Sequence, residues 1–137
     1  MTRINLVNPS ELTDQHLIAE YREITMVPVA LNRTLKSKIG LRNEKINKKY
    51  TLNTGHVYFF YDKGKYLYKR YLDLIEEMKN RGFNPDKKRT FPTKIFKNNE
   101  LYKDWIPDFN DLKIIKKRIS KKIAMKPNWY KKTKKSH

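Results

Sequence analysis

The spacing of apolar side chains predicts a chain built from three main helices. The first is entered at residues 9–11, with Ser10 as the expected N-cap. Its inner face is then marked at i, i+4 and i+7 by Leu17, Tyr21 and Ile24. Pro28 must kink this helix or restart it, because proline removes a backbone donor from a helix interior. We therefore expect a broken helical region that ends at Gly40.

The second and third helices have clearer limits. Residues 65–81 carry one apolar face throughout, formed by Leu67, Tyr71, Leu74, Ile75 and Met78. Gly82 follows in the C′ position, where glycine commonly ends a helix. The third helix begins near Asp108, a plausible N-cap, and is stopped by Pro127. Its inward positions are Leu112, Ile115, Ile119 and Ile123.

The connections between these helices are long and irregular. The aromatic run within residues 51–62 has no partner strand elsewhere, so we expect an extended segment inserted into a helical core. Residues 83–107 are rich in lysine and proline and are predicted to form a surface loop. The pattern thus predicts a compact all-α single domain over residues 1–131, followed by a basic mobile tail at 132–137.

The charge balance adds a statement about partners. The chain of 137 residues has 32 Lys and Arg against 14 Asp and Glu, a formal net charge of +18. Such an excess informs on partners rather than on fold. Nucleic acid is the first candidate, an anionic membrane surface is the second, and a small protein that is simply basic is the third.

Several chemistries are disfavoured by what the sequence lacks. There is no cysteine, which excludes disulfides and thiolate chemistry. The three histidines, His16, His56 and His137, are far apart in sequence, and no nucleotide-binding or hydrolase motif occurs, so we expect neither a metal nor a cofactor. The apolar stretch 26–31 is far too short to span a bilayer, and no secretory signal is apparent. We expect a soluble intracellular protein.

Three polar residues of the first helix form one stripe. His16, Glu20 and Glu23 stand at i, i+4 and i+7, with Arg22 at the border. Two carboxylates and an imidazole on one face are able to transfer protons. The same spacing also fits a solvated helix face with i, i+4 pairs, and His16 alone fits a hydrogen-bonded structural residue.

The N-terminus is a second candidate. If Met1 is removed, as a small second residue permits, Thr2 carries a free α-amine. The ordinary pKa of such an amine is about 7.7–8.0, against about 10.4 for lysine, and a nearby cation such as Arg3 lowers it further. An unprotonated amine forms Schiff bases with sugars and aldehydes. The residues alone make this a weak signal, since every protein has an N-terminus.

The C-terminal third is suited to a polyanion. Lysines on the third helix would contact phosphates without reading sequence. Trp129 and Tyr130 stand among lysines in the stretch 126–132, where aromatic rings stack on bases or sugars. An equally good interpretation is that the tryptophan docks the tail onto the core, and both can hold.

Four stretches together carry a resemblance to a known family. They are MTRINL at the start, SELTDQHLIAEYRE at 10–23, LNTGHVYFFYDKGKYL at 52–67, and the pattern R-x-x-x-K-I-A-x-x-P-x-W-Y-K over 118–131. In this order and spacing they resemble the phage-type endonuclease V family. These are pyrimidine-dimer DNA glycosylases with abasic-site lyase activity, found in phages and large algal viruses. The resemblance is weakest in 83–107 and after Lys131.

The resemblance implies a compact all-helical domain and a mechanism. The Thr2 amine attacks the anomeric carbon of the 5′ nucleotide of a cyclobutane dimer, the base leaves, an imine forms, and β-elimination cuts the strand. Glu23 is implied to stabilise the cationic sugar and move protons. The family's pocket residues match Arg3, His16 and Arg22 here. Its DNA-contacting residues match Arg118, Lys122, Trp129, Tyr130 and Lys131.

The resemblance also implies a partner, double-stranded DNA with UV photoproducts or abasic sites, and a protein that acts as a monomer without a cofactor. Two departures affect the DNA grip. One type of member has a cation where this chain has Met26, and a Tyr-Tyr-Gly run where this chain has residues 132–137. The alternative from another class is a basic DNA- or RNA-binding protein without chemistry, which needs neither Thr2 nor Glu23.

Overall fold

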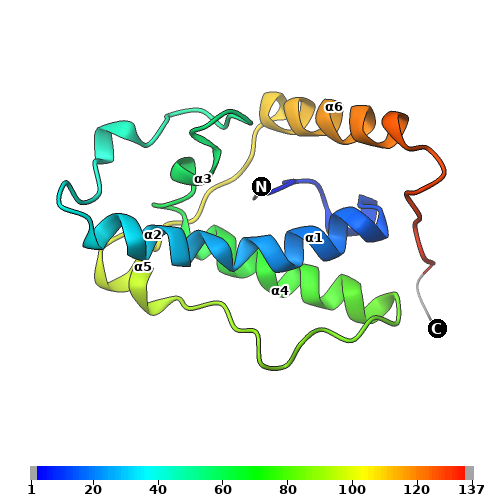
Figure 1. The fold of residues 1–137 in the computed structure, drawn as a ribbon, viewed down its shortest axis with the longest axis horizontal. Helices are drawn as coiled ribbons and strands as arrows, with labels where there is room; N and C mark the ends of the chain where they lie inside the picture. The colour runs from blue at the N-terminus through cyan, green and yellow to red at the C-terminus, as the bar shows by residue number, and fades with distance from the viewer. Residues whose placement is uncertain (1–2, 135–137) are drawn as a thin grey trace.

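The computed structural model describes residues 3–134 and consists of helices joined by irregular segments (Figure 1). In chain order the elements are η1 (Pro9–Glu11), α1 (Asp14–Ile24), α2 (Met26–Lys36), η2 (Asn43–Lys45), α3 (His56–Phe59), α4 (Gly64–Asn80), α5 (Lys94–Asn98) and α6 (Phe109–Met125). No β-strand occurs in this part of the chain, where the one extended pairing is an isolated bridge between Lys63 and Tyr102. The prediction of an all-α fold is confirmed.

The first predicted helix is two helices with a different start. Asn8 caps the short turn η1, and α1 begins only after Thr13, whose side chain accepts a hydrogen bond from the His16 N–H. Ser10 is therefore not the N-cap that the sequence predicted, because it lies inside η1. Pro28 restarts the helix as expected, since it lies in the first turn of α2, where its missing N–H costs nothing.

Helix α4 ends as its sequence predicts. Gly82 has a φ of +88°, a conformation that side chains disfavour. Its N–H donates to the Lys79 carbonyl at 3.0 Å, and the Phe83 N–H donates to the Met78 carbonyl at 2.9 Å. These two bonds satisfy carbonyls that the helix end would leave bare.

Two of the predicted irregular stretches contain helices. The aromatic run forms α3 rather than an extended segment, because the turn before it places Gly55 as the N-cap of His56–Phe59. The predicted surface loop contains α5 and contributes Phe91 and Phe96 to the core. Helix α4 starts directly against Phe96, and a Cβ on Gly64 would lie 2.4 Å from its ring. Apolar side chains therefore anchor this connection.

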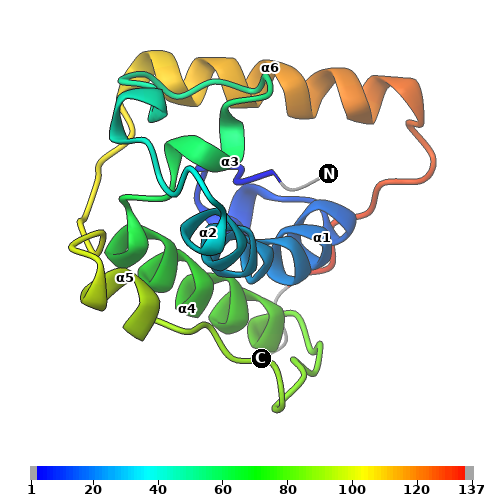
Figure 2. The same ribbon diagram turned by 60° about the vertical axis from the view of Figure 1, so that its left-hand side comes forward.

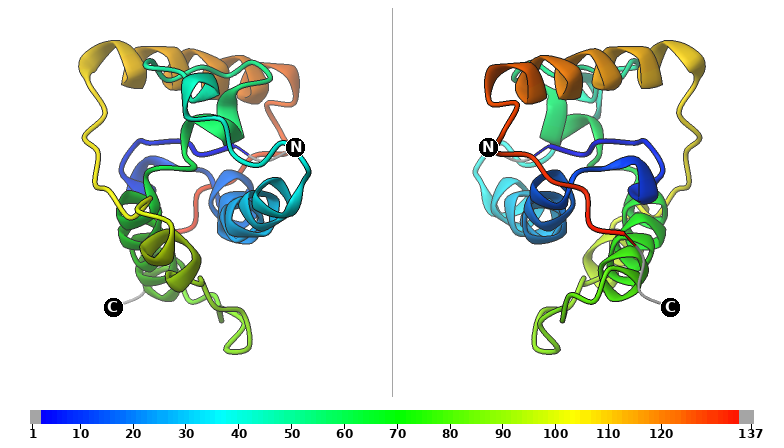
Figure 3. Two further views of the ribbon diagram at one scale, coloured as in Figure 1. Left: turned by 90° about the vertical axis from the view of Figure 1, so that its left-hand side faces the viewer. Right: turned by 90° about the vertical axis from the view of Figure 1, so that its right-hand side faces the viewer.

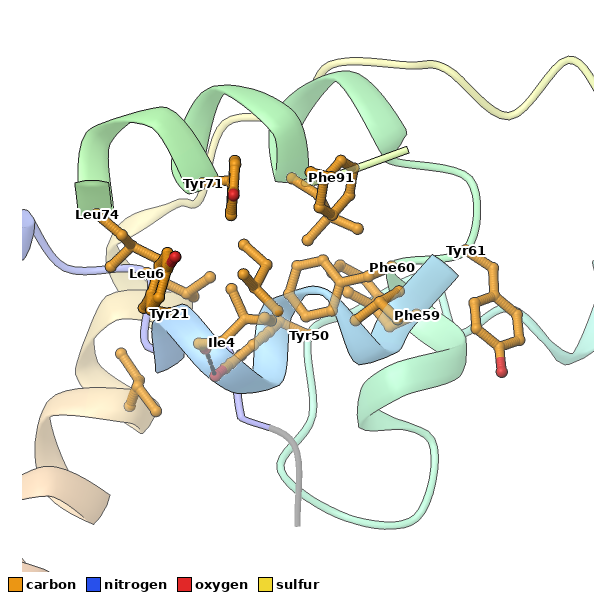
Figure 4. Packing of buried hydrophobic residues seen from close by; sticks show 14 of the residues in the cluster. Ile4, Leu6, Tyr21, Tyr50, Phe59, Phe60, Tyr61, Tyr71, Leu74 and Phe91 are labelled. Atoms are coloured by element: carbon orange, nitrogen blue, oxygen red, sulfur yellow. Dashed lines mark hydrogen bonds between the residues drawn. The ribbon is translucent and has the colours of Figure 1, made fainter. Parts of the chain in front are cut away.

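The core lies between α1, α3 and α4, where aromatic rings from distant segments meet (Figure 4). Tyr21 of α1 stacks on Tyr71 of α4 with ring centroids 5.9 Å apart. Helix α6 runs along the opposite side of the molecule from α4, with α1 between them (Figure 2). It contributes one fully buried side chain, Ile115, and its start is secured by a capping box between Asp108 and Asp111.

The N-terminal segment, residues 3–7, passes between α1 and α6 (Figures 2 and 3). A buried ion pair between α1 and α4 holds it there. The Arg70 guanidinium donates to both oxygens of Glu20, at 2.5 and 3.0 Å, and to the Val7 carbonyl at 2.6 Å. The other contact of Glu20 is the N–H of Asn5 at 3.1 Å. One carboxylate and one guanidinium thus join two helices and the N-terminal segment.

This ion pair yields a stability prediction. Replacing Arg70 by Met should lower the free energy of unfolding by about 3–5 kcal/mol, because Glu20 would remain buried without its counter-charge. Urea denaturation followed by circular dichroism measures the change.

The neighbouring residue provides the matched control. Lys69 pairs with Asp104 at 2.7 Å, but its side chain is 58% exposed. Lys69→Met should therefore lower the free energy of unfolding far less than Arg70→Met does, because solvent screens an exposed pair. Equal losses for the two variants would contradict the structural role of the buried pair.

Candidate active site

Side chains, not a neighbouring strand, satisfy the backbone of the N-terminal segment. The N–H of Arg3 donates to Glu23 Oε1 at 3.1 Å, and that of Ile4 donates to His56 Nε2 at 2.9 Å. The Asn5 N–H bonds to Glu20, as described above. Three consecutive peptide groups are therefore fixed by three residues from α1 and α3. Thr2, the predicted nucleophile, lies outside the described residues, but the peptide nitrogen of the residue after it is bonded to Glu23.

A pocket of about 240 Å³ opens between α1, α6 and this segment. It is smaller than the roughly 300–1,000 Å³ of pockets for drug-sized ligands, and is thus of a size for part of a nucleotide. Seven of the ten predicted site residues line it: Arg3, His16, Glu23, Arg118, Lys122, Trp129 and Tyr130. The structure therefore brings together residues from both ends of the chain.

The polar stripe of α1 faces this pocket. His16, Glu20 and Glu23 all line it, and Glu20 is only 1% exposed. The alternative of a solvated helix face is therefore wrong. The two carboxylates differ in their surroundings, because Glu20 is occupied by Arg70 whereas Glu23 receives the N–H of Arg3.

The Glu23 carboxylate is half-buried, and burial raises its pKa above the ordinary value. The Arg3 N–H and the charge of Arg118 act in the opposite direction. The Arg3 guanidinium is also affected by Arg118. Burial and the charge of Arg118 both lower the pKa of Arg3. The pocket thus combines a carboxylate with a raised pKa and closely spaced cations.

His16 has both a structural and a pocket position. Its Nδ1 lies 2.7 Å from the Thr13 hydroxyl, and its ring stacks on Tyr130 with centroids 4.8 Å apart and an angle of 7°. Burial lowers the pKa of His16, and the charge of Arg118 lowers it further. The expectation of a hydrogen-bonded histidine fits these contacts, and the ring also forms part of the pocket wall.

The C-terminal segment is clamped onto the start of α1. The Gln15 side chain donates to the Trp129 carbonyl at 2.8 Å and accepts from the Lys131 N–H at 2.9 Å. The Tyr130 ring packs on His16, whereas Trp129 stays 54% exposed beside the pocket. The residue that docks the tail is therefore the tyrosine.

The docking continues beyond Lys131. Thr133 donates to Asp14 from its N–H at 3.1 Å and from its hydroxyl at 2.5 Å. The prediction of an unpacked tail from residue 132 is thus wrong at Thr133, because Asp14 provides a polar anchor for it. Residues 135–137 of that tail lie outside the described part.

Two predicted residues lie apart from the pocket walls. Arg22 is exposed on α1, and Lys131 is exposed while its backbone carbonyl accepts from the Asp14 N–H at 2.6 Å. Arg118 and Lys122 are one turn apart on α6, the first half-buried and the second exposed. Their roles toward DNA remain predictions.

Sequence reasoning missed three residues that line the pocket: Asn5, Gln15 and Ala19. Gln15 and Ala19 share a helix with the predicted stripe, so a wider helical face would have included them. Asn5 has no periodic signal, because the segment 3–7 belongs to no helix or strand. Within residues 3–134, no group of three His, Asp or Glu side chains is placed to hold a metal ion, and no helix is long and apolar enough to cross a bilayer.

The pocket of this small helical domain holds a carboxylate and several cations and lies beside a lysine-rich helix. Such a site is suited to chemistry on a polyanion. The family model for pyrimidine dimer DNA glycosylase matches residues 1–91, which include the N-terminal segment, α1 and α4. The chain belongs to this family, and it is a pyrimidine-dimer DNA glycosylase that acts on DNA. The resemblance described above is confirmed over these residues, and a basic binding protein without chemistry does not agree with this membership.

His56 gives a pH prediction for the support of this site. Its Nε2 accepts from Ile4, so its proton is on Nδ1, which faces the Thr51 carbonyl at 2.8 Å. Burial lowers the pKa of His56 to about 4. The unfolded chain takes up this proton near the ordinary value of 6.5, so stability is full above that pH and falls as the pH drops toward 4. We expect a loss of about 3 kcal/mol over this range, at about 1.4 kcal/mol per pH unit.

Urea denaturation at several pH values between 7 and 4 measures this loss. Other groups also titrate there, so the decisive quantity is the difference from His56→Gln, a variant that keeps an acceptor but does not titrate. Its stability should depend less steeply on pH. The same slope in both proteins would remove His56 as the cause.

Proposed function

We propose that this enzyme both excises the base of a cyclobutane pyrimidine dimer and cuts the abasic strand by β-elimination. The nucleophile is the α-amine of Thr2, and the carboxylate that assists it is Glu23. The observation that carries this proposal is the 3.1 Å hydrogen bond from the Arg3 N–H to Glu23. It supports an arrangement in which the residue before Arg3 starts beside a carboxylate within a small pocket.

In the first step the unprotonated amine nitrogen bonds to C1′ as the glycosidic bond breaks. The base leaves with the bonding pair and takes up a proton, and the nitrogen loses one. The C1′–O4′ bond then opens, the ring oxygen becomes a hydroxyl, and the nitrogen pair forms a protonated imine. Removal of a C2′ proton expels the 3′ phosphate, and water hydrolyses the imine to free the amine. No step changes the overall oxidation state.

Glu23 suits two of these steps. As a carboxylate it stabilises the positive charge on the sugar, and it accepts a proton during elimination. Burial raises the pKa of Glu23, which makes its carboxylate a stronger base than that of an exposed glutamate. Amine and carboxylate together suffice for the electron and proton transfers, so the proposal includes neither a metal nor a cofactor.

The cations and aromatic rings fit the DNA. Arg118 and Lys122 of α6 would hold phosphates at the rim, and the exposed Trp129 would stack on a base or sugar. Helix α6 has no acidic residue after its first turn, so every charged side chain from Lys113 to the end of the helix is a lysine or an arginine. We propose that a monomer acts on double-stranded DNA with UV photoproducts or abasic sites, inside the cell.

The carboxylate prediction uses Glu23→Gln. Base release from dimer-containing DNA should fall at least about a hundredfold, the low end of general acid–base effects, because the amide carries no charge and accepts no proton. DNA affinity should survive, since phosphate contacts come from cations. Single-turnover cleavage and a filter-binding assay measure the two quantities.

Glu44→Gln makes the same charge change on an exposed residue of η2 and should leave both quantities as they are. Near-normal cleavage by Glu23→Gln would remove this carboxylate from the mechanism.

The nucleophile prediction concerns Thr2. Borohydride added during the reaction should trap the protein on dimer-containing DNA, and mass spectrometry after digestion should place the adduct on the Thr2 α-amine. A retained Met1 would move the amine one residue along the chain, about 3.3–3.6 Å. Attack needs the atoms about 3–3.5 Å apart, so this form should be severely impaired.

Acetylation of the Thr2 amine should abolish both trapping and cleavage. An adduct on a lysine, or full activity of the acetylated enzyme, would contradict the assignment.

A further inference from the structure

Asn5 is one of the residues that line the pocket. The residue is only 3% exposed, and its backbone N–H is used by Glu20. Its side-chain oxygen, however, is buried and has no hydrogen-bond partner within residues 3–134. The nearby Glu20, Arg70 and His56 all have their polar atoms bonded.

Such an atom has a physical cost. A buried acceptor without a donor loses its hydration and gains nothing in return, and most buried polar groups in folded proteins are therefore paired. A leucine has nearly the same branched shape and no polar atom. The unpaired amide at the pocket wall thus indicates a group that finds its partner in a ligand.

We infer that Asn5 is a substrate-contacting residue that hydrogen-bonds the deoxyribose of the damaged nucleotide. This inference rests on the proposed function, because it assigns the pocket to the sugar that reacts. Asn5 and Arg3 belong to the same fixed segment, bonded to Glu20 and Glu23, one turn apart on α1. The amide therefore shares its pocket with the carboxylate that assists the sugar chemistry.

The chemistry of the sugar fits an amide better than a charged group. The ring oxygen is an acceptor in the intact nucleotide and becomes a hydroxyl, a donor as well, when the ring opens. An asparagine has a donor and an acceptor on one planar group, and can match both states. A phosphate offers acceptors alone and is better held by the cations of α6.

The experiment compares Asn5→Leu and Asn5→Ala with wild type on two substrates, dimer-containing DNA and DNA with a preformed abasic site. Single-turnover rates at saturating enzyme separate the chemistry from DNA affinity. Both variants should be slower by at least about tenfold on both substrates, the loss expected for one hydrogen bond to the reacting sugar. Asn98→Ala, a change at an exposed residue of α5, should behave as wild type.

Stability is the second readout. Removing an amide whose oxygen has no hydrogen-bond partner within residues 3–134 should leave the urea midpoint of Asn5→Leu unchanged or higher. Asn5→Ala provides the same test if leucine overfills the site. A clear loss of stability in both variants would assign Asn5 a structural role and overturn the inference, as would wild-type rates on both substrates.

The two substrates also separate the sugar from the base. Slow reaction on dimer DNA with a normal rate on abasic DNA would place the contact on the base, and the assignment to the sugar would be wrong. Borohydride trapping of the wild-type protein tests the imine mechanism independently. Failure of that mechanism is therefore visible without reference to Asn5.

Discussion

The arrangement of the active site depends on the buried ion pair between Glu20 and Arg70. Its two direct bonds join α1 to α4, and its remaining atoms bind the Asn5 N–H and the Val7 carbonyl. Burial alone disfavours the charged guanidinium, but Glu20 holds the pKa of Arg70 above its ordinary value. Glu20 is one turn before Glu23 on a rigid helix. The anchor of the N-terminal segment and the carboxylate of the pocket are consequently positioned by the same element.

This arrangement answers a difficulty that arises when an N-terminus takes part in chemistry. A chain end usually frays, because few contacts restrain it. Here the peptide groups of residues 3–5 are bonded one after another to Glu23, His56 and Glu20, and the Tyr50 hydroxyl donates to the Ile4 carbonyl at 2.9 Å. Side chains on helices can satisfy a segment with no adjacent strand, so residues 3–5 are positioned without a sheet. The polar atoms of the buried Glu20 and His56 side chains are therefore occupied by structural hydrogen bonds.

The sequence predicted those features that depend on neighbours along the chain. Helical spacing placed α4 and the stripe of α1, and local chemistry placed the cap at Asp108 and the stop at Gly82. The prediction from sequence failed where contacts between residues far apart in the chain determine the structure. Spacing does not tell which carboxylate of the stripe faces an arginine fifty positions away, nor that α5 is anchored by Phe96 beneath Gly64. The docking of Thr133 on Asp14 is likewise invisible locally, and a run of lysines otherwise indicates a free tail.

The pocket therefore has two walls with different physical origins. The wall from α1 and the N-terminal segment carries two carboxylates, the buried Glu20 and the half-buried Glu23, and each accepts a backbone N–H of that segment. The wall from α6 is basic and rests on little apolar burial beyond Ile115, so it depends on the C-terminal clamp at Gln15 and Asp14. Arg118 belongs to the α6 wall, and its charge acts to lower the pKa of both Glu23 and His16 on the opposite wall. The position of α6 consequently affects the electrostatics of the carboxylate as well as the proposed contacts with phosphate, and a DNA contact that moves this helix would alter both together.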